Sequence, residues 1–77
     1  MNKRSKEYSK EWLKANLALC TEPQVRLFKR MYYFKNLEAS IDEVVDNMNP
    51  ESYDNAINQV ERTLNKAGIE PKKVLAL

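Results

Sequence analysis

Apolar residues in the first twenty positions recur at the spacing of an α-helix. One stripe advances by steps of four, three and four residues: Tyr8, Trp12, Ala15 and Leu19. An adjoining stripe holds Leu13, Leu17 and Cys20. Because side chains three and four residues apart share a helix face, the pattern predicts a helix with a wide buried face and a buried Trp12. We place it from about Lys10 to Cys20, with Ser9 as the N-cap, and Pro23 limits its extension.

A capping box marks the start of the second helix. The Thr21 hydroxyl is placed to accept from the Gln24 amide, and the Gln24 side chain is placed to accept from the Thr21 amide. Pro23 fits the first turn of a helix, where its missing N–H has no partner to lose. This helix is expected to end at Tyr33 or Phe34 and to face inward with three residues: Leu27, Phe28 and Met31.

Two further helices are predicted in the second half of the chain. Ser40 and Glu43 have the spacing of a second capping box, and a short helix follows with its inward face formed by Ile41, Val44, Val45 and Met48. Asn49 and Pro50 end that helix and start the next, with Asn49 as the cap and Pro50 as the first helical residue. The apolar stripe of the last helix is long and regular: Tyr53, Ala56, Ile57, Val60, Leu64 and Ala67.

Gly68 marks the end of the last helix, since glycine suits the left-handed position after a helix end, and Ile69 is placed to fold back onto the final turn. The sequence therefore predicts an all-α fold, a single small domain of about four helices over residues 1–77. Residues 1–8 form a basic N-terminal arm in this interpretation, and residues 70–77 form a tail that makes one more turn or stays extended. The last two helices have the outline of a helix-turn-helix.

Composition supports a helical fold and narrows the chemistry. Apolar residues make up 43% and charged residues 31% of the chain, which is typical of a folded globular domain. A single glycine argues against hairpin-rich β structure, because tight β-turns need residues that accept positive φ. The chain holds no histidine and one cysteine, so it has no internal disulfide and lacks the ligands of a usual zinc site. We expect no metal and no cofactor.

The hydropathy pattern gives no sign of a membrane segment. No stretch reaches the ~20 apolar residues that span a bilayer. The basic start of the chain resembles the first region of a signal peptide, but the charged residues from Glu7 to Lys14 interrupt the apolar region that should follow. A single thiol also suits a reducing compartment. The sequence therefore indicates a cytoplasmic protein with no membrane partner.

Charge is divided unevenly along the chain. Residues 1–37 hold nine Lys or Arg against three acids, residues 38–77 hold four against eight, and the net charge is +2. Two predicted helix faces are basic, one with Lys6, Lys10 and Lys14 and the other with Arg26, Lys29 and Arg30. Three interpretations stay open. The faces are a solvated surface with weak pairs such as Glu7 with Lys10, or the basic half packs against the acidic half, or an anionic partner binds there.

Catalysis has few candidate groups in this chain. Without histidine, acid–base chemistry would fall to carboxylates, lysine, tyrosine or Cys20. Cys20 lies at the C-terminal end of the first predicted helix, where the helix dipole opposes formation of a thiolate. The sequence also lacks a glycine-rich loop of the kind that holds phosphates. We therefore expect that the chain is not an enzyme and that Cys20 lies in or near the core.

DNA binding by the helix-turn-helix outline is the alternative function. The candidate nucleic-acid contacts lie on the last helix: Asn55, Asn58, Gln59 and Arg62. Asparagine and glutamine side chains pair well with adenine edges. However, Glu51 and Asp54 at the start of this helix oppose the approach of phosphates.

Protein binding fits the sequence best. Tyr32, Tyr33 and Phe34 are consecutive, and successive residues of a helix point about 100° apart, so at least one ring should be exposed or should pack under the following loop. The alternative is that all three rings cover the core at the end of the helix. The predicted partner-binding face is basic and aromatic: Arg26, Lys29, Arg30 and Tyr33, with Lys10 and Lys14. The expected function is an accessory regulator or inhibitor, of the kind that phages encode. It would dock through this face on a larger protein or nucleoprotein partner.

Overall fold

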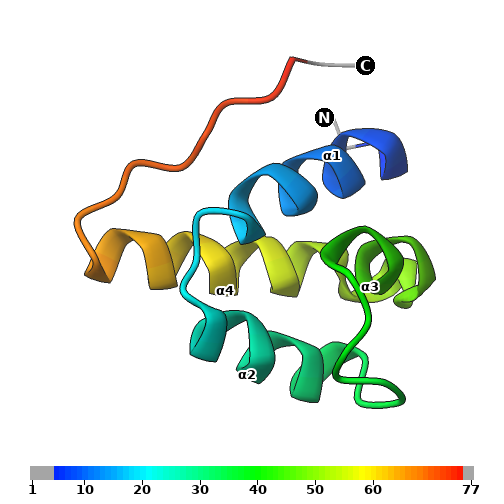
Figure 1. Ribbon diagram of the computed structural model, residues 1–77. Helices are drawn as coiled ribbons and strands as arrows, with labels where there is room; N and C mark the ends of the chain where they lie inside the picture. Colours follow the sequence, from blue (N-terminus) through cyan, green and yellow to red (C-terminus); the bar gives the residue numbers. More distant parts are fainter. Residues whose placement is uncertain (1–4, 76–77) are drawn as a thin grey trace.

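The computed structural model of the chain describes residues 5–75 and contains four α-helices and one short 3-10 helix within them (Figure 1). In chain order these are α1 (Lys6–Leu17), α2 (Glu22–Tyr32), α3 (Ile41–Asn47), η1 (Pro50–Ser52) and α4 (Tyr53–Lys66). The predicted all-α class with about four helices is confirmed. Positions 1–4 of the predicted arm and positions 76–77 of the predicted tail lie outside the described residues.

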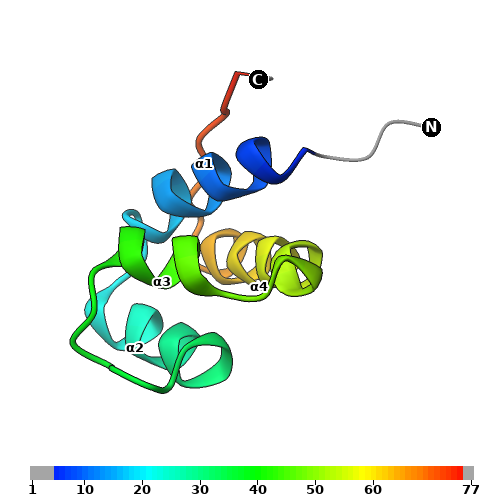
Figure 2. The same ribbon diagram turned by 90° about the vertical axis from the view of Figure 1, so that its right-hand side faces the viewer.

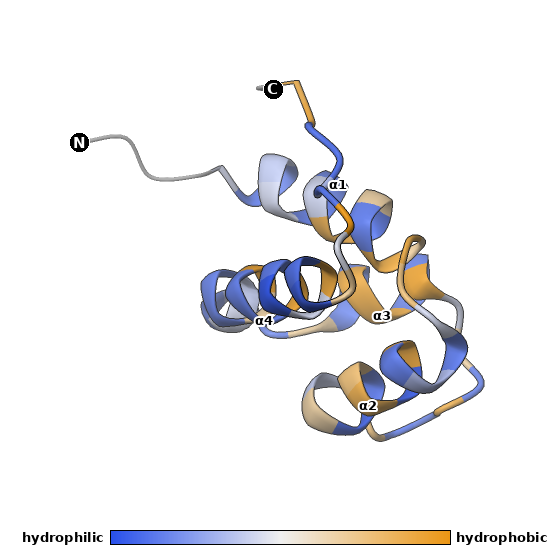
Figure 3. Ribbon diagram, turned by 90° about the vertical axis from the view of Figure 1, so that its left-hand side faces the viewer, coloured by the Kyte–Doolittle hydropathy of each residue, from blue (hydrophilic) through white to orange (hydrophobic). Residues whose placement is uncertain are grey.

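The helices lie at three levels around one core. α3 and α4 form the middle level, α1 lies on one side of them and α2 on the other (Figures 1 and 2). Hydrophobic positions of α1, α3 and α4 gather where these helices meet (Figure 3). The buried apolar residues are Trp12, Leu13, Leu17, Phe28, Ala39, Val44, Val45, Met48, Tyr53, Ala56, Ile57, Val60 and Leu64. The buried position predicted for Trp12 is confirmed, whereas Ala67 at the end of the predicted stripe is exposed.

α1 begins and ends earlier than the sequence indicated. Its N-cap is Ser5, whose hydroxyl accepts from the Tyr8 amide at 3.0 Å, and its last residue is Leu17 rather than Cys20. Ser9, predicted as the cap, lies inside the helix and is buried. The earlier start adds a turn that places Ser9 on the same face as Trp12, so the helix covers more of the core. Positions 6–8 therefore belong to α1 and not to an arm.

The capping box of α2 is confirmed in both directions. The Thr21 amide donates to Gln24 Oε1 at 2.8 Å, and the Gln24 amide donates to Thr21 Oγ1 at 3.4 Å. Asn49 also acts as predicted, because its side chain accepts from the Glu51 amide at 3.0 Å and Pro50 is the first helical residue. The first turn of this helix differs from the prediction in its helix type. The new helix starts as the 3-10 turn η1 before it continues as α4.

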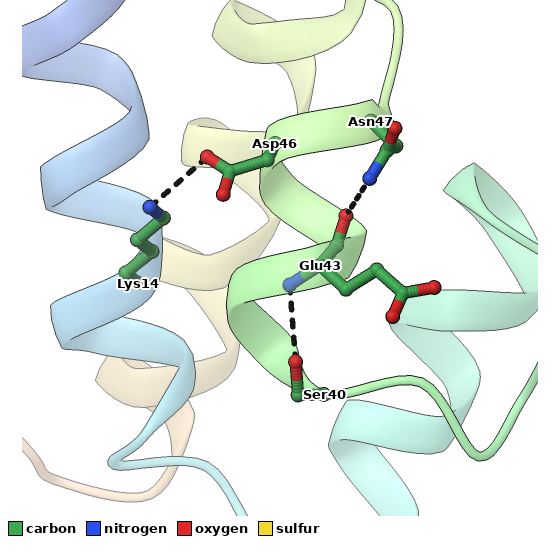
Figure 4. Close-up of polar contacts among 5 residues, drawn as sticks. All are labelled: Lys14, Ser40, Glu43, Asp46 and Asn47. Atoms are coloured by element: carbon green, nitrogen blue, oxygen red, sulfur yellow. Dashed lines mark hydrogen bonds and ion pairs between the residues drawn. The ribbon is translucent and has the colours of Figure 1, made fainter.

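The predicted second capping box is only half formed. The Ser40 hydroxyl accepts from the Glu43 amide at 3.1 Å, as expected of a cap. The Glu43 carboxylate points away from Ser40 toward α2 (Figure 4) and accepts from the Tyr33 hydroxyl at 3.3 Å. The backbone oxygen of Glu43 accepts from Asn47 Nδ2 at 2.8 Å. A tertiary contact has therefore taken the side chain that would complete the box.

Gly68 ends α4 with a φ of +73°, the left-handed conformation predicted for it. The Ile69 amide then donates to the Leu64 backbone oxygen at 2.9 Å, so the chain folds back on the last turn as expected. The segment that follows, up to residue 75, is extended and turns back along α1 (Figures 1 and 3). The Lys72 amide donates to Asn16 Oδ1 at 2.6 Å, and Asn16 Nδ2 donates to the Lys72 backbone oxygen at 3.1 Å.

Candidate functional site

α2 lies at the edge of the domain and contributes little to its core. Of its eleven residues only Phe28 is buried, and the Phe28 ring packs against Tyr32 with centroids 4.7 Å apart. In Figures 1 and 2 no other described helix lies beyond α2 on its outer side. Because only a narrow side of α2 meets the core, most of its circumference faces solvent.

Three bases predicted to bind a partner lie on α2, and two of them make contacts within the domain. Arg26 Nη2 lies 3.7 Å from Glu38 Oε1, and Lys29 Nζ donates to the Leu37 backbone oxygen at 3.1 Å. Both contacts fasten the loop between α2 and α3 to α2. Arg30 is exposed and makes no ion pair with any residue from 5 to 75. Of the three bases, Arg30 is therefore the most available to a partner.

The aromatic run after α2 divides between the core and the solvent. Tyr32 and Tyr33 are half-buried against the core, whereas Phe34 is 76% exposed. Of the predicted alternatives, exposure of one ring is confirmed, and the alternative in which all three rings cover the core is wrong. Burial raises the pKa of Tyr33, and the charge of Glu43 and the hydrogen bond to it act in the same direction. The Tyr33 hydroxyl is thus hydrogen-bonded to Glu43 of α3, and Phe34 is the exposed ring of the three.

Lys10 and Lys14 lie on α1, on the far side of α3 and α4 from α2 (Figures 1 and 2). Lys14 Nζ lies 3.0 Å from Asp46 Oδ1 of α3 (Figure 4), and this hydrogen bond raises the pKa of Lys14. Lys10 is half-buried. The six residues predicted to bind a partner therefore do not form one surface.

Two ion pairs are found among residues 5–75, and both join the two halves of the chain. They are Lys14 with Asp46 and Arg26 with Glu38. Each joins a base from the first half of the chain to an acid from the second half. Part of the uneven charge is therefore explained by packing of the basic half against the acidic half, which was one of the three interpretations left open.

Leu27 and Met31 were predicted to face the core, and this prediction is wrong because both face solvent. Leu27 is 59% exposed and Met31 is 54% exposed, and both lie on the same side of α2, four residues apart. Leu27 and Phe28 point about 100° apart, so a helix packed along one narrow side cannot bury both. No signal in the sequence indicated this, because other helices of the domain bury consecutive residues, such as Ala56 and Ile57 of α4.

The residues of α4 predicted to contact DNA lie beside α2. Asn55, Asn58 and Arg62 are exposed, whereas Gln59 is half-buried and its Nε2 donates to Met31 Sδ at 3.3 Å. The predicted helix-turn-helix outline is present as α3, η1 and α4, with all of its predicted packing residues buried: Val44, Val45, Met48, Ile57 and Val60. Through the contact between Gln59 and Met31, this face of α4 adjoins the two exposed apolar residues of α2, Leu27 and Met31, which we call the exposed strip.

A small hollow of about 70 Å³ lies between the end of α1, α2 and α4. Its lining includes Leu17, Leu27, Phe28, Gln59, Val60 and Thr63. Sites that enclose a small molecule usually measure about 300–1,000 Å³, so this hollow is too small for one. It is large enough to receive a protruding side chain from another molecule.

Cys20 borders this hollow but offers little reactivity. The thiol is half-buried and donates to the Asn16 backbone oxygen at 3.6 Å. Burial raises the pKa of Cys20, which disfavours the thiolate needed for nucleophilic attack. Across residues 5–75, no three His, Cys, Asp or Glu side chains gather closely enough to hold a metal ion.

Comparisons of the chain with known protein families, with curated proteins and with solved structures find no match.

α4 is the longest described helix, with 14 residues. Within the described part of the chain, no helix has the length and hydropathy required to cross a bilayer.

Proposed function

We propose that this chain is a non-enzymatic protein-binding domain that acts as an accessory regulator or inhibitor of a larger protein or nucleoprotein. One observation carries the proposal. α2 exposes Leu27 and Met31 to solvent beside Arg30, although the helix has only one buried residue of its own, and Phe34 is exposed two residues after the helix ends. Methionine, arginine and aromatic residues are the types enriched in protein interfaces. Large apolar side chains that neither stabilise the core nor avoid water point to a partner.

The proposed face keeps part of the face predicted from the sequence. Arg30 is its free charge, and Arg26 and Lys29 border it while they hold the neighbouring loop. Tyr33 is half-buried, and the exposed aromatic residue is Phe34, which follows the end of α2. Lys10 and Lys14 lie on another side of the domain and do not extend this face.

A role without catalysis is part of the same proposal. The raised pKa of the Cys20 thiol and its position on a hollow of about 70 Å³ argue against nucleophilic chemistry there. A cytoplasmic location remains our expectation from the sequence.

The experiment that tests this function is capture of partners from the native host, with and without nuclease. The bait proteins are the wild type, Arg30→Glu combined with Phe34→Ser, and the control Lys10→Glu on α1. We expect a protein partner that survives nuclease, binds the control and is lost with the double variant. A partner bound equally by all three baits would move the interface away from α2.

DNA binding stays as the second candidate, because α3, η1 and α4 leave Asn55, Asn58 and Arg62 exposed along one helix. Selection over random duplexes separates the two functions. A sequence-specific regulator should enrich a motif bound at about 10⁻⁸ M, and Asn55→Ala should relax that preference. A protein-binding domain should show only the non-specific affinity of about 10⁻⁴ M or weaker at physiological salt.

A further inference from the structure

The exposed strip on α2 continues into a groove between α2 and α4. Leu27 lines the small hollow whose other walls include Phe28 of α2 and Val60 of α4. Leu27 also lines a shallow depression on its other side, together with Pro23, Arg26 and Arg30. Leu27 therefore joins the outer side of α2 to the hollow beside α4, whose lining also includes the polar side chains of Gln24, Gln59 and Thr63.

Basic side chains border this groove on both sides. Arg26 and Arg30 line the depression on the α2 side. On the α4 side, Gln59 and Thr63 line both the hollow and an adjoining depression that is completed by Arg62 and Lys66. Arg62 and Lys66 belong to the acidic half of the chain, and only the packing of α4 beside α2 brings them to the same surface as the arginines.

The acidic residues of α4 lie on another side of that helix. Asp54 and Glu61 are seven residues apart and so share a face, whereas Arg62 and Lys66 share the neighbouring face with Gln59. Glu38 lies 3.7 Å from Arg26 in an exposed pair, and Glu22 directly precedes Pro23 at the end of the depression. Such exposed pairs contribute little to stability, so a carboxylate from a partner can replace Glu38 at small cost.

From these observations we infer that the groove between α2 and α4 binds an amphipathic helix of a partner protein, with an apolar stripe between two rows of acidic residues. This inference rests on the proposed protein-binding function and names the class of partner. The apolar stripe packs on Leu27 and Met31 and places one side chain in the hollow. The acidic rows face Arg26 and Arg30 on one side and Arg62 and Lys66 on the other. Helix-in-groove recognition of this kind uses anchors three and four residues apart.

The length of the groove matches that of a short helix. From Pro23 to Tyr32, α2 extends along about 14 Å at the usual rise per residue. A partner helix of about two and a half turns matches that length. Met31 adds adaptability, because its flexible thioether packs against side chains of different shape.

A second copy of this chain does not supply the matching helix. α3 is the most acidic helix, with Asp42, Glu43 and Asp46, but its apolar residues Val44 and Val45 are buried in its own core. In the part of the chain that the structure describes, no helix presents an exposed apolar stripe between acids. The partner is therefore a different protein.

Selection from a displayed library of 14-residue helical peptides tests the inference. The wild-type protein is the target, and a Leu27→Ser/Met31→Ser protein removes unspecific binders. We expect enrichment of peptides with Leu, Phe or Met at helical spacing flanked by Asp and Glu. Failure to enrich any peptide, or enrichment of peptides without acids, would overturn the inference.

Matched charge variants then locate the acidic rows. Arg62→Glu/Lys66→Glu should weaken an enriched peptide about tenfold or more, with a smaller effect at high salt. Lys72→Glu/Lys73→Glu makes the same charge change on the C-terminal segment and should alter binding less than about twofold. Equal losses in the two variants would show that net charge, and not the groove, attracts the peptide. Thermal melts followed by circular dichroism confirm that each variant is folded, which is expected because all these side chains are exposed.

Two further measurements distinguish a helix-binding groove from a surface with a different ligand. Binding of vesicles with phosphatidylserine, or of random DNA, that is lost in Leu27→Ser/Met31→Ser without any peptide enrichment would assign the surface to a membrane or a nucleic acid. A captured host protein that still binds the groove variants would preserve the protein-binding function and overturn the groove as its site.

Discussion

The buried amide of Asn16 should be a main support of the C-terminal segment. Its side chain is fully buried and makes three hydrogen bonds, one to the Trp12 backbone oxygen at 3.0 Å and two to the backbone of Lys72. Asn16→Ala removes all three and leaves a small cavity. At a net value of about 1 kcal/mol for each hydrogen bond, the substitution should cost about 2–3 kcal/mol.

That loss is large for a domain of this size. A chain of 77 residues has an unfolding free energy of roughly 4–12 kcal/mol, and a loss of 2–3 kcal/mol lowers Tm by roughly 10–20 °C. Urea unfolding, followed by the fluorescence of the buried Trp12 and by circular dichroism at 222 nm, measures the difference.

A double-mutant cycle tests whether the cost arises at the C-terminal segment. Deletion of the chain after Glu70 removes Lys72 and lets water reach Asn16. In that shortened chain Asn16→Ala should cost less than about 1 kcal/mol, because water replaces the lost partners. An equal cost in the full and shortened chains would refute the reasoning and place the effect of Asn16 within α1 alone.

Three other perturbations give expected outcomes. Trp12→Ala removes a large core side chain and should cost roughly 3–5 kcal/mol, which a urea titration would show as loss of most of the folded population. Thr21→Ala should cost about 1 kcal/mol through loss of the cap of α2, and an unchanged midpoint would mean that α2 forms without it. Because Asp46 raises the pKa of Lys14 above its ordinary value of 10.5, that pair should stabilise the fold fully below about pH 10 and lose its effect as pH rises through the raised pKa. Unfolding of Lys14→Met and the wild type should therefore differ by up to about 1 kcal/mol near pH 8 and converge at high pH.

Local signals predicted the helix boundaries best. Thr21, Asn49 and Gly68 act through groups within a few residues of themselves, so their roles are visible in the sequence. Ser5 and Ser9 are both good caps, and the choice between them is made by the core. The longer helix adds a turn that buries Ser9 and packs Tyr8 against the core. A capping rule considers only residues near the helix end, so it cannot predict this tertiary contact.

The candidate site was harder to predict because it depends on which side of α2 the core covers. Periodicity identifies the apolar residues of a helix but not the neighbour that covers them, so Leu27 and Met31 were assigned to the interior. The approach of Arg62 to the arginines of α2 depends on the packing of α2 beside α4. The contact between Asn16 and Lys72, 56 residues apart, also lies beyond any local pattern.

The single buried residue of α2 has a consequence for the motions of the domain. Segments with few buried contacts open as separate cooperative units at a lower free energy than global unfolding. Amide hydrogens of α2 should therefore exchange with solvent well before those of α1 and α4, whose buried faces open only when the whole core unfolds. A ligand helix lying along α2 would suppress that opening, so the slowing of exchange in α2 would report occupancy of the groove even where the helices keep their positions.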